Sequence, residues 1–312
     1  EQATALAGLS PAQGGPLLTT MLKDGDQRVI PSVLNALVTL RTPGLETVLL
    51  EHLKAEDAVI RAAAANGLGA LKAAGALKPL AEAYEAWQRD ALYTARAAAL
   101  AALVKIDPAA ARPILEAALK DRDWAVRVRA AELLRESGAR ESFAEVMRPA
   151  LPGRAVSDTE WSWLLAPPFS PHAYLETDRG TIEIELAVLD APLTVANFID
   201  LARKGFFNNV PIHRVVPDFV VQDGDPRGEG EGGPGYTIRD EINQRPYLRG
   251  TLGMALDWED TGGSQFFLTH SPQPHLDGRY TVFGHVVSGL EILDGIQPWD
   301  VLRRVTIWDG IR

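Results

Sequence analysis

The stretch that decides how the C-terminal half is interpreted is PIHRVVPDFVVQDGDP, residues 211–226. Arg214 interrupts an apolar run that contains Ile212, Val215 and Val216, and such a run is typical of a buried strand. An unpaired guanidinium in this position would be costly. Taken alone, the strand favours an arginine in an ion pair of a β-barrel; the alternative is an arginine that acts on a ligand.

The segments around this stretch predict a mainly β domain. The sequence YLETDRGTIEIELA, residues 174–187, alternates apolar and polar residues around an Asp-Arg-Gly turn. Residues 192–207 predict a helix, because Val195, Phe198, Leu201 and Ala202 have helical spacing. Short strands and glycine-rich turns continue to a second helix near Leu290 to Ile296. Many short strands with two helices favour a closed β-barrel with helical plugs.

Three further motifs complete the pattern: GTLGMA (250–255), GSQFFLTH (263–270) and HLDGRYTVFGHV (275–286). In this order and spacing, the four motifs resemble the cyclophilins, and the resemblance covers nearly all of residues 173–312. It implies an eight-stranded antiparallel barrel capped by two helices. It also implies peptidyl-prolyl cis-trans isomerase activity on proline-containing polypeptides.

The implied reaction requires no nucleophile, metal or cofactor. Rotation about an X–Pro bond is slow because amide resonance is lost, with a barrier of about 18–20 kcal/mol. A catalyst needs a pocket for the proline ring, a fixed donor that favours the twisted amide, and a desolvated groove.

The resemblance assigns site residues by matching position. Arg214 is implied as the catalytic donor, with Gln265 as a second catalytic residue. The implied substrate-binding residues are Phe219, Val220, Gln222, Ala255, Phe267, Leu276, His275 and Tyr280. Without the motifs, the apolar members of this set would be interpreted as ordinary core and the glutamines as solvent-facing amides.

Four positions depart from the family pattern. Val220 replaces a common methionine, which changes the shape of the pocket while keeping it apolar. His275 lies where many eukaryotic members have a tryptophan that grips cyclosporin, so we expect weakened cyclosporin binding. Tyr280 replaces a common histidine, as in bacterial-type sequences. Leu256 replaces a frequent asparagine, so one side-chain contact with substrate is in question.

The first half of the chain has a different, helical pattern. Arg61, Arg96 and Arg127 each lie near the start of an alanine-rich helix, at intervals of 35 and 31 residues. Units of helix, turn and helix cannot bury their apolar faces alone, so they are expected to stack as a solenoid. The spacing resembles HEAT-type repeats over residues 1–140; the alternative is a non-repetitive helical bundle. Repeat surfaces typically bind proteins, so we expect a protein partner or client there.

Residues 141–172 contain prolines and tryptophans without a sustained period, which indicates a linker. Trp161, Trp163, Leu164, Leu165 and Phe169 are costly to expose, each stabilising by about 1.5–3 kcal/mol when buried. We therefore expect this segment to pack against one or both domains.

Charge and composition restrict the partners and leave the compartment open. The net charge of −10 arises after residue 150, because residues 1–150 contain 18 acidic and 18 basic residues. An acidic C-terminal half disfavours nucleic acid as a partner. No apolar run long enough for a membrane span is present. The chain has no cysteine and starts at Glu1, which suggests a missing upstream segment; cytoplasmic and cell-envelope locations both stay possible.

Two other patterns are not interpreted as cofactor or metal sites. GEGEGG (228–233) matches a dinucleotide-loop pattern, but no helix follows it, so we interpret it as a glycine-rich loop beside the substrate groove. The spacing of Asp223, Asp225, Asp257, Glu259 and Asp260 does not fit a calcium loop, and these residues are expected to be solvated loop charges. No metal site is expected. The functional alternatives to an isomerase are a proline-peptide-binding scaffold and a chaperone with little turnover.

Overall fold

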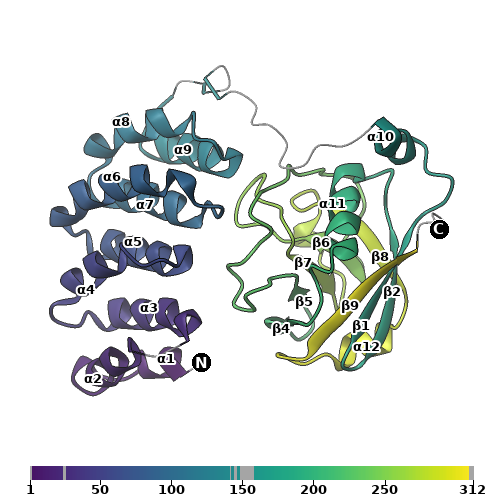
Figure 1. Cartoon of the computed structure of the whole chain (residues 1–312), viewed down its shortest axis with the longest axis horizontal. Coiled ribbons are helices and arrows are strands. Elements are labelled where there is room, and N and C mark those ends of the chain that lie inside the picture. The colour runs from purple at the N-terminus through teal and green to yellow at the C-terminus, as the bar shows by residue number, and fades with distance from the viewer. Residues whose placement is uncertain (1, 24–25, 141, 144–145, 148–157, 309–312) are drawn as a thin grey trace. The chain divides into compact units, whose positions relative to one another are not determined.

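The computed structural model describes residues 2–23, 26–140, 142–143, 146–147 and 158–308 (Figure 1). The chain divides into two compact units, Glu1–Ala150 and Leu151–Arg312. Each unit has its own hydrophobic core. In the described part of the chain, no helix combines the length and the hydropathy needed to cross a membrane.

The first unit is helical. Its α-helices are α1 (Gln2–Leu6), α2 (Pro11–Met21), α3 (Ile30–Leu40), α4 (Leu45–His52), α5 (Ala58–Leu71), α6 (Leu77–Ala86), α7 (Thr94–Ile106), α8 (Pro108–Ala118) and α9 (Trp124–Glu136). Asp57, Asp107 and Asp123 cap α5, α8 and α9, because each carboxylate accepts a backbone N–H from the first turn. These caps fix where the three helices begin.

The helices stack in layers (Figure 1). Helices α1, α3, α5, α7 and α9 pack against one another in that order, while α2, α4, α6 and α8 each pack beside the following helix. The core between layers consists mainly of leucine and alanine. The stacked arrangement is therefore present, and its assignment to HEAT-type repeats stays a prediction.

The second unit is built on one curled antiparallel sheet. Its strands are β1 (His172–Thr177), β2 (Gly180–Leu186), β3 (Val210–Pro211), β4 (Arg214–Val216), β5 (Val220–Asp223), β6 (Thr251–Met254), β7 (Phe266–Thr269), β8 (Val282–Ser288) and β9 (Val301–Trp308). They are hydrogen-bonded in the order β3-β9-β1-β2-β8-β6-β7-β5-β4.

The described sheet has nine strands rather than the expected eight. Its two edge strands, β3 and β4, are separated only by Ile212 and His213, so the two edges of the sheet meet within one short segment. The sequence pattern predicted one apolar strand that contains Ile212, Val215 and Val216. The structure divides it, because β3 pairs with β9 whereas β4 pairs with β5.

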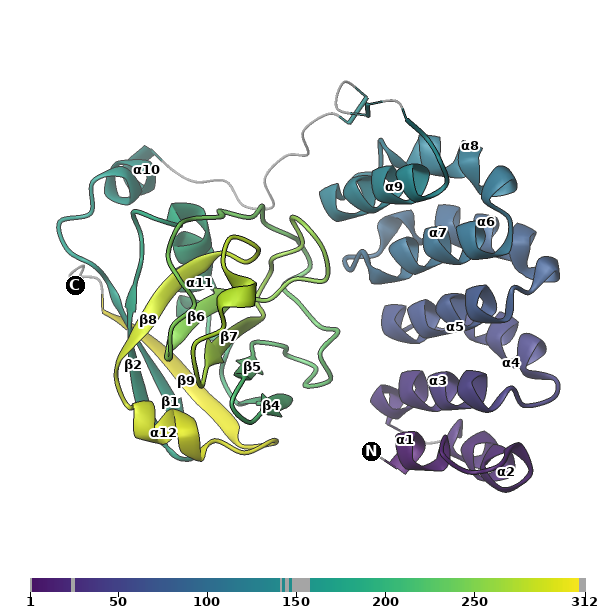
Figure 2. The same cartoon turned by 180° about the vertical axis from the view of Figure 1, so that it is seen from behind.

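Two helices cover the sheet, at different ends of it in both views (Figures 1 and 2). Helix α11 (Pro192–Arg203) places Phe198 against the rings of Phe207, Phe266 and Phe283, with centroids 5.1–5.5 Å from that of Phe198. Helix α12 (Leu290–Gly295) packs against β2. Both helices agree with the sequence pattern.

A third helix, α10 (Asp158–Leu165), lies in the segment expected to be a linker. Leu164 is only 1% exposed and Trp163 packs beside it on the barrel core, while the Phe169 ring lies 5.2 Å from that of Trp308. The predicted packing is thus confirmed for these three residues and wrong for Leu165, which is 71% exposed. The side chain of Trp161 lies outside the described residues.

Candidate active site

The β4–β5 hairpin fixes the central pair of the site. In its register, Arg214 is the cross-strand partner of Gln222 and Val216 is that of Val220. Directly opposed residues project from the same face of a sheet, so the guanidinium and the amide emerge together. The turn between the strands is held by Ser271 and Gln273, whose side chains donate to the carbonyl oxygen of Asp218 at 2.5 and 2.8 Å.

Three polar side chains form a chain of hydrogen bonds that we call the amide relay: Arg214, Gln222 and Gln265. Arg214 Nη1 donates to Gln222 Oε1 at 3.0 Å, and Gln222 Nε2 donates to Gln265 Oε1 at 3.0 Å. Gln265 Nε2 in turn donates to the carbonyl oxygens of Gly230 and Gly232, at 2.8 and 2.9 Å. The relay thus runs from the exposed guanidinium to the glycine-rich loop.

Beside the relay lies a small apolar cluster separate from the main core of the β unit, which we call the pocket cluster. It consists of buried Val220, Tyr247, Phe267, Leu276 and Val282, with Phe219, Ala255 and Tyr280 packed against them. Six of these eight residues were predicted from the sequence. The structure therefore gathers the expected apolar side chains in one place.

Phe267 is the centre of this cluster. Its ring stacks on Tyr247, with centroids 5.5 Å apart, and meets the edge of Tyr280 at 5.8 Å. Gly253 lies opposite Phe267 in the sheet, and a Cβ there would come within 2.5 Å of both Phe267 Cζ and the Tyr247 hydroxyl. Only glycine permits this approach. Tyr247 was missed because this contact joins distant parts of the chain and leaves no local pattern.

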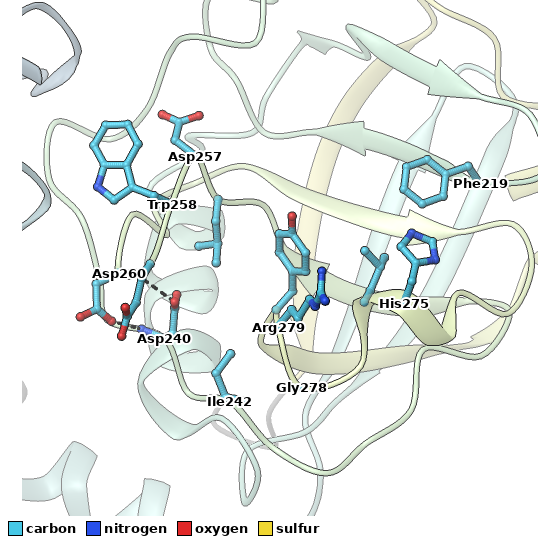
Figure 3. A pocket seen from close by; sticks show the side chains of 13 residues that line it. Phe219, Asp240, Ile242, Asp257, Trp258, Asp260, His275, Gly278 and Arg279 are labelled. Carbon is cyan, nitrogen blue, oxygen red and sulfur yellow. Dashed lines mark hydrogen bonds between the residues drawn. The ribbon is translucent and has the colours of Figure 1, made fainter. Parts of the chain in front are cut away.

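Phe219 connects the relay to a surface groove. Its ring lies between the Arg214 guanidinium, 5.6 Å from the ring centroid, and the His275 ring, stacked at 5.7 Å. The groove has a volume of about 720 Å³, and Phe219 and His275 lie at one end of it (Figure 3). Leu276, Tyr280 and Leu256 also line it. The predicted residues Val220, Ala255 and Phe267 do not line it and lie in the pocket cluster instead.

The far end of the groove is acidic and was not predicted as part of the site. Asp240, Asp257 and Asp260 lie there with Trp258 (Figure 3). The backbone N–H of Asp240 donates to Asp260 Oδ1 at 2.9 Å, and that of Asp260 donates to Asp240 Oδ2 at 3.0 Å. Burial is the main cause that raises the pKa of Asp240 to about 6.

Two aspartates correct an expectation from the sequence. Asp223 and Asp225, interpreted as solvated loop charges, are 3% and 0% exposed. Both belong to the end of β5 and the turn after it, where the chain passes beneath the glycine-rich loop. Across the described ranges, no group of three or more histidine, aspartate or glutamate side chains is arranged to hold a metal ion.

A family model described as cyclophilin type peptidyl-prolyl cis-trans isomerase/CLD matches residues 172–308. A peptidyl-prolyl cis-trans isomerase of Synechococcus elongatus is 55% identical over 137 residues, which cover 43% of this chain and 94% of that protein. The chain belongs to the cyclophilin-type peptidyl-prolyl cis-trans isomerases. The cyclophilin match lies in the β unit, which is therefore an isomerase domain.

A second relative agrees with this assignment. Peptidyl-prolyl cis-trans isomerase B of Bacillus subtilis is 50% identical over 136 residues, covering 43% of this chain and 95% of that protein. Among solved structures, a Cryptosporidium parvum cyclophilin in the presence of the dipeptide Ala-Pro is 30% identical. It covers 45% of this chain and 99% of that one, with a TM-score of 0.42. The family match does not include the helical unit.

Proposed function

We propose that Arg214 is the catalytic donor of this cyclophilin and that the pocket cluster receives the substrate proline ring. The observation that carries the proposal is the amide relay, because it points a guanidinium held by Gln222 toward solvent beside an isolated apolar cluster. An apolar floor beside a fixed cation is what recognition of a proline and its preceding carbonyl requires.

The environment of Arg214 supports a functional over a structural role. Within the described residues its contacts are the Gln222 amide and the Phe219 ring, with no carboxylate partner. This disfavours the interpretation of Arg214 as one half of a barrel ion pair. Its remaining N–H groups are free to bind a ligand, since a guanidinium carries five donors.

The proposed chemistry is electrostatic. When the X–Pro bond twists, resonance is lost and electron density returns to the prolyl nitrogen. A donor fixed near that nitrogen binds the twisted amide more strongly than the planar one, and this difference lowers the barrier. Gln265 contributes by holding Gln222, while its own N–H groups bind the glycine-rich loop. Gln222 keeps the guanidinium in place, so little reorganisation is needed during rotation.

The other predicted residues fit binding roles in this proposal. Phe219, Val220, Phe267 and Leu276 supply apolar contact with the ring, Ala255 and Tyr280 border it, and His275 extends the aromatic surface beyond Phe219. Because His275 is smaller than the tryptophan of many relatives, we propose that cyclosporin binds weakly here.

The test compares Arg214→Lys with Arg249→Lys, an exposed arginine of the same unit that pairs with Asp294. Lysine keeps the charge but cannot bond Gln222 and the substrate at once with a planar fork. We expect Arg214→Lys to lower kcat/KM on a Xaa-Pro peptide by at least about tenfold, and Arg249→Lys to resemble wild type. Full activity of Arg214→Lys would contradict the proposed geometry. Peptide binding by the wild type without turnover would favour the scaffold alternative instead.

We also propose that the helical unit binds a protein client or partner. Two observations support this: its stacked helices present an extended surface, and residues 1–150 carry equal numbers of acidic and basic residues. Stacked helical repeats commonly use such surfaces for protein recognition. In this proposal the unit recruits polypeptides whose prolines the barrel isomerises, a chaperone-like role for the whole chain.

A further inference from the structure

The glycine-rich loop after β5 is organised around one buried carboxylate. Asp225 is 0% exposed, and its Oδ1 accepts the backbone N–H of Arg227 at 2.7 Å. Its Oδ2 accepts the N–H groups of Glu229 and Gly230, at 2.9 and 2.5 Å. Three backbone donors that converge on one side chain fix the course of the loop.

The same loop closes tightly over Asp225. A Cβ on Gly232 would lie 1.9 Å from Asp225 Oδ1, so only glycine allows the chain to pass at this distance. The turn from Gly230 to Gly232 then presents two carbonyl oxygens to Gln265 Nε2. Gly232, which is not one of the three glycines that match the dinucleotide pattern (Gly228, Gly230 and Gly233), therefore serves close packing around an aspartate.

These two carbonyl groups determine how the amides of the relay are oriented. The NH₂ group of Gln265 has two donors and both are used, so its Oε1 faces Gln222 Nε2. With that bond made, Gln222 Oε1 faces Arg214. If the side-chain amide of Gln265 were rotated by 180°, its Oε1 would face two carbonyl oxygens. Its Nε2 would then face Gln222 Nε2, so that one donor would face another.

We infer that Asp225 is a positioning residue for isomerisation, acting on Arg214 through the glycine-rich loop, Gln265 and Gln222. The inference rests on the proposed role of Arg214 and adds Asp225 as a buried residue that supports it. Within the described residues, the hydrogen bonds of the Asp225 side chain go to the glycine-rich loop, and this loop orients Gln265.

A double-mutant cycle in the full chain tests this route. We expect Asp225→Ala to lower kcat/KM on a Xaa-Pro peptide about tenfold, since small misplacements of a catalytic group are costly. In a Gln265→Ala background, Asp225→Ala should change kcat/KM by less than about twofold, because the route is already broken. The inference would be overturned if the two substitutions together lowered kcat/KM by the product of their separate effects. Wild-type activity of Asp225→Ala would overturn it as well.

Two controls separate positioning from general loss of structure. Asp178 also accepts a backbone N–H, that of Val301, at the opposite side of the sheet order from β5. Asp178→Ala should therefore leave kcat/KM unchanged. The side-chain amide NMR signals of Gln222 should move in Asp225→Ala and not in Asp178→Ala; unmoved Gln222 signals in Asp225→Ala would count against the inference.

If circular dichroism shows that Asp225→Ala is unfolded, the same cycle is run with Asp225→Asn. Asparagine keeps one acceptor oxygen and replaces the other by a donor, so at least one loop N–H loses its partner. A loss of kcat/KM that is smaller than that of Asp225→Ala and that disappears in the Gln265→Ala background supports the inference. Wild-type activity of Asp225→Asn overturns it. Activity retained by Arg214→Ala would instead refute the proposed function itself.

Discussion

The exposed guanidinium of Arg214 depends on two local features of the chain. The β4–β5 register places it opposite Gln222, and the turn residue Phe219 folds back so that its ring lies under the cation. A slip of one residue would turn the Arg214 side chain to the other face of the sheet. The register is therefore as important to the site as the residue itself.

Residues that the structure brings together could be predicted where their motif was continuous. Arg214, Phe219 and Gln222 lie within ten residues of one another, and Gln265 and Phe267 lie within another short motif. Tyr247 and Asp240 could not be found in this way. They join the pocket cluster and the groove only through contacts between segments distant in sequence.

Asp223 gives a prediction about pH. Its carboxylate is buried, and burial raises its pKa to about 7 against the smaller, opposite effect of the Gly224 backbone N–H. Because the folded pKa lies above the unfolded value, the protonated form favours folding. The associated stability is full below about pH 4 and is lost as the pH rises through about 7.

Asp223→Asn removes this titration while keeping the shape of the side chain. We expect it to raise the free energy of unfolding of the barrel at pH 8 by at least about 1 kcal/mol more than at pH 5. Urea unfolding, monitored through hydrogen exchange of the β5 and β7 amides, measures this difference in the free energy of unfolding. Asp218→Asn, in the exposed turn of the same hairpin, is the matched control. An equal effect of Asp223→Asn at both pH values would contradict the assigned pKa.

At the scale of the element, successive helix layers are joined by buried arginines. Arg96 on α7 is 0% exposed, and its Nε lies 3.3 Å from Asp121 Oδ2 in the turn before α9. Arg61 on α5 makes the corresponding ion pair with Asp90, in the turn before α7. The 35-residue spacing between Arg61 and Arg96 therefore corresponds to a link that is repeated from one layer to the next.

Arg96→Leu should destabilise the helical unit by about 3–5 kcal/mol, because it leaves the buried Asp121 without its cation. Arg112→Leu is the matched control, since Arg112 forms an exposed pair with Glu116 on α8 and should cost about 0.5 kcal/mol or less. Chemical denaturation followed by the helical signal compares the two. A similar small cost for both variants would show that the buried link does not hold the layers together.

Local patterns predicted whether a segment is a helix or a strand, but they did not predict where a strand is interrupted. Helical spacing predicted α11 and the late helix α12, and alternation predicted β1 and β2. The break between β3 and β4 has no local signature, because it depends on which neighbour each half meets in the curled sheet. Helix α10 was not predicted, because it lies in a proline-rich segment with weak helical propensity. Leu164 of this helix packs on the core of the β unit, and such tertiary contacts can override propensity.

At the scale of the whole molecule, the chain joins an isomerase domain to a helical unit that the cyclophilin family model does not cover. The family model covers residues 172–308, so the family of the isomerase domain could be predicted from motifs. The role of the helical unit was not, since repeat sequences are set by core packing and carry few residues tied to a ligand.

Deletion of residues 1–140 tests whether the helical unit recruits clients. Rotation of a short Xaa-Pro peptide requires only the barrel, so its kcat/KM should stay within about twofold of the full chain. Refolding of a proline-limited protein substrate should slow by about tenfold or more if recruitment raises the local substrate concentration. Arg214→Ala in the full chain is the control for catalysis. Equal refolding rates with and without the helical unit would contradict the recruitment proposal.

The most direct test of the account is the activity of Arg214→Ala on a Xaa-Pro peptide, measured together with peptide binding. We predict that kcat/KM falls by about a hundredfold or more, as expected for loss of a donor to the twisted amide. The circular dichroism spectrum should be unchanged and the pocket should still bind the peptide. A correctly folded Arg214→Ala protein with activity within about twofold of wild type would contradict the central claim.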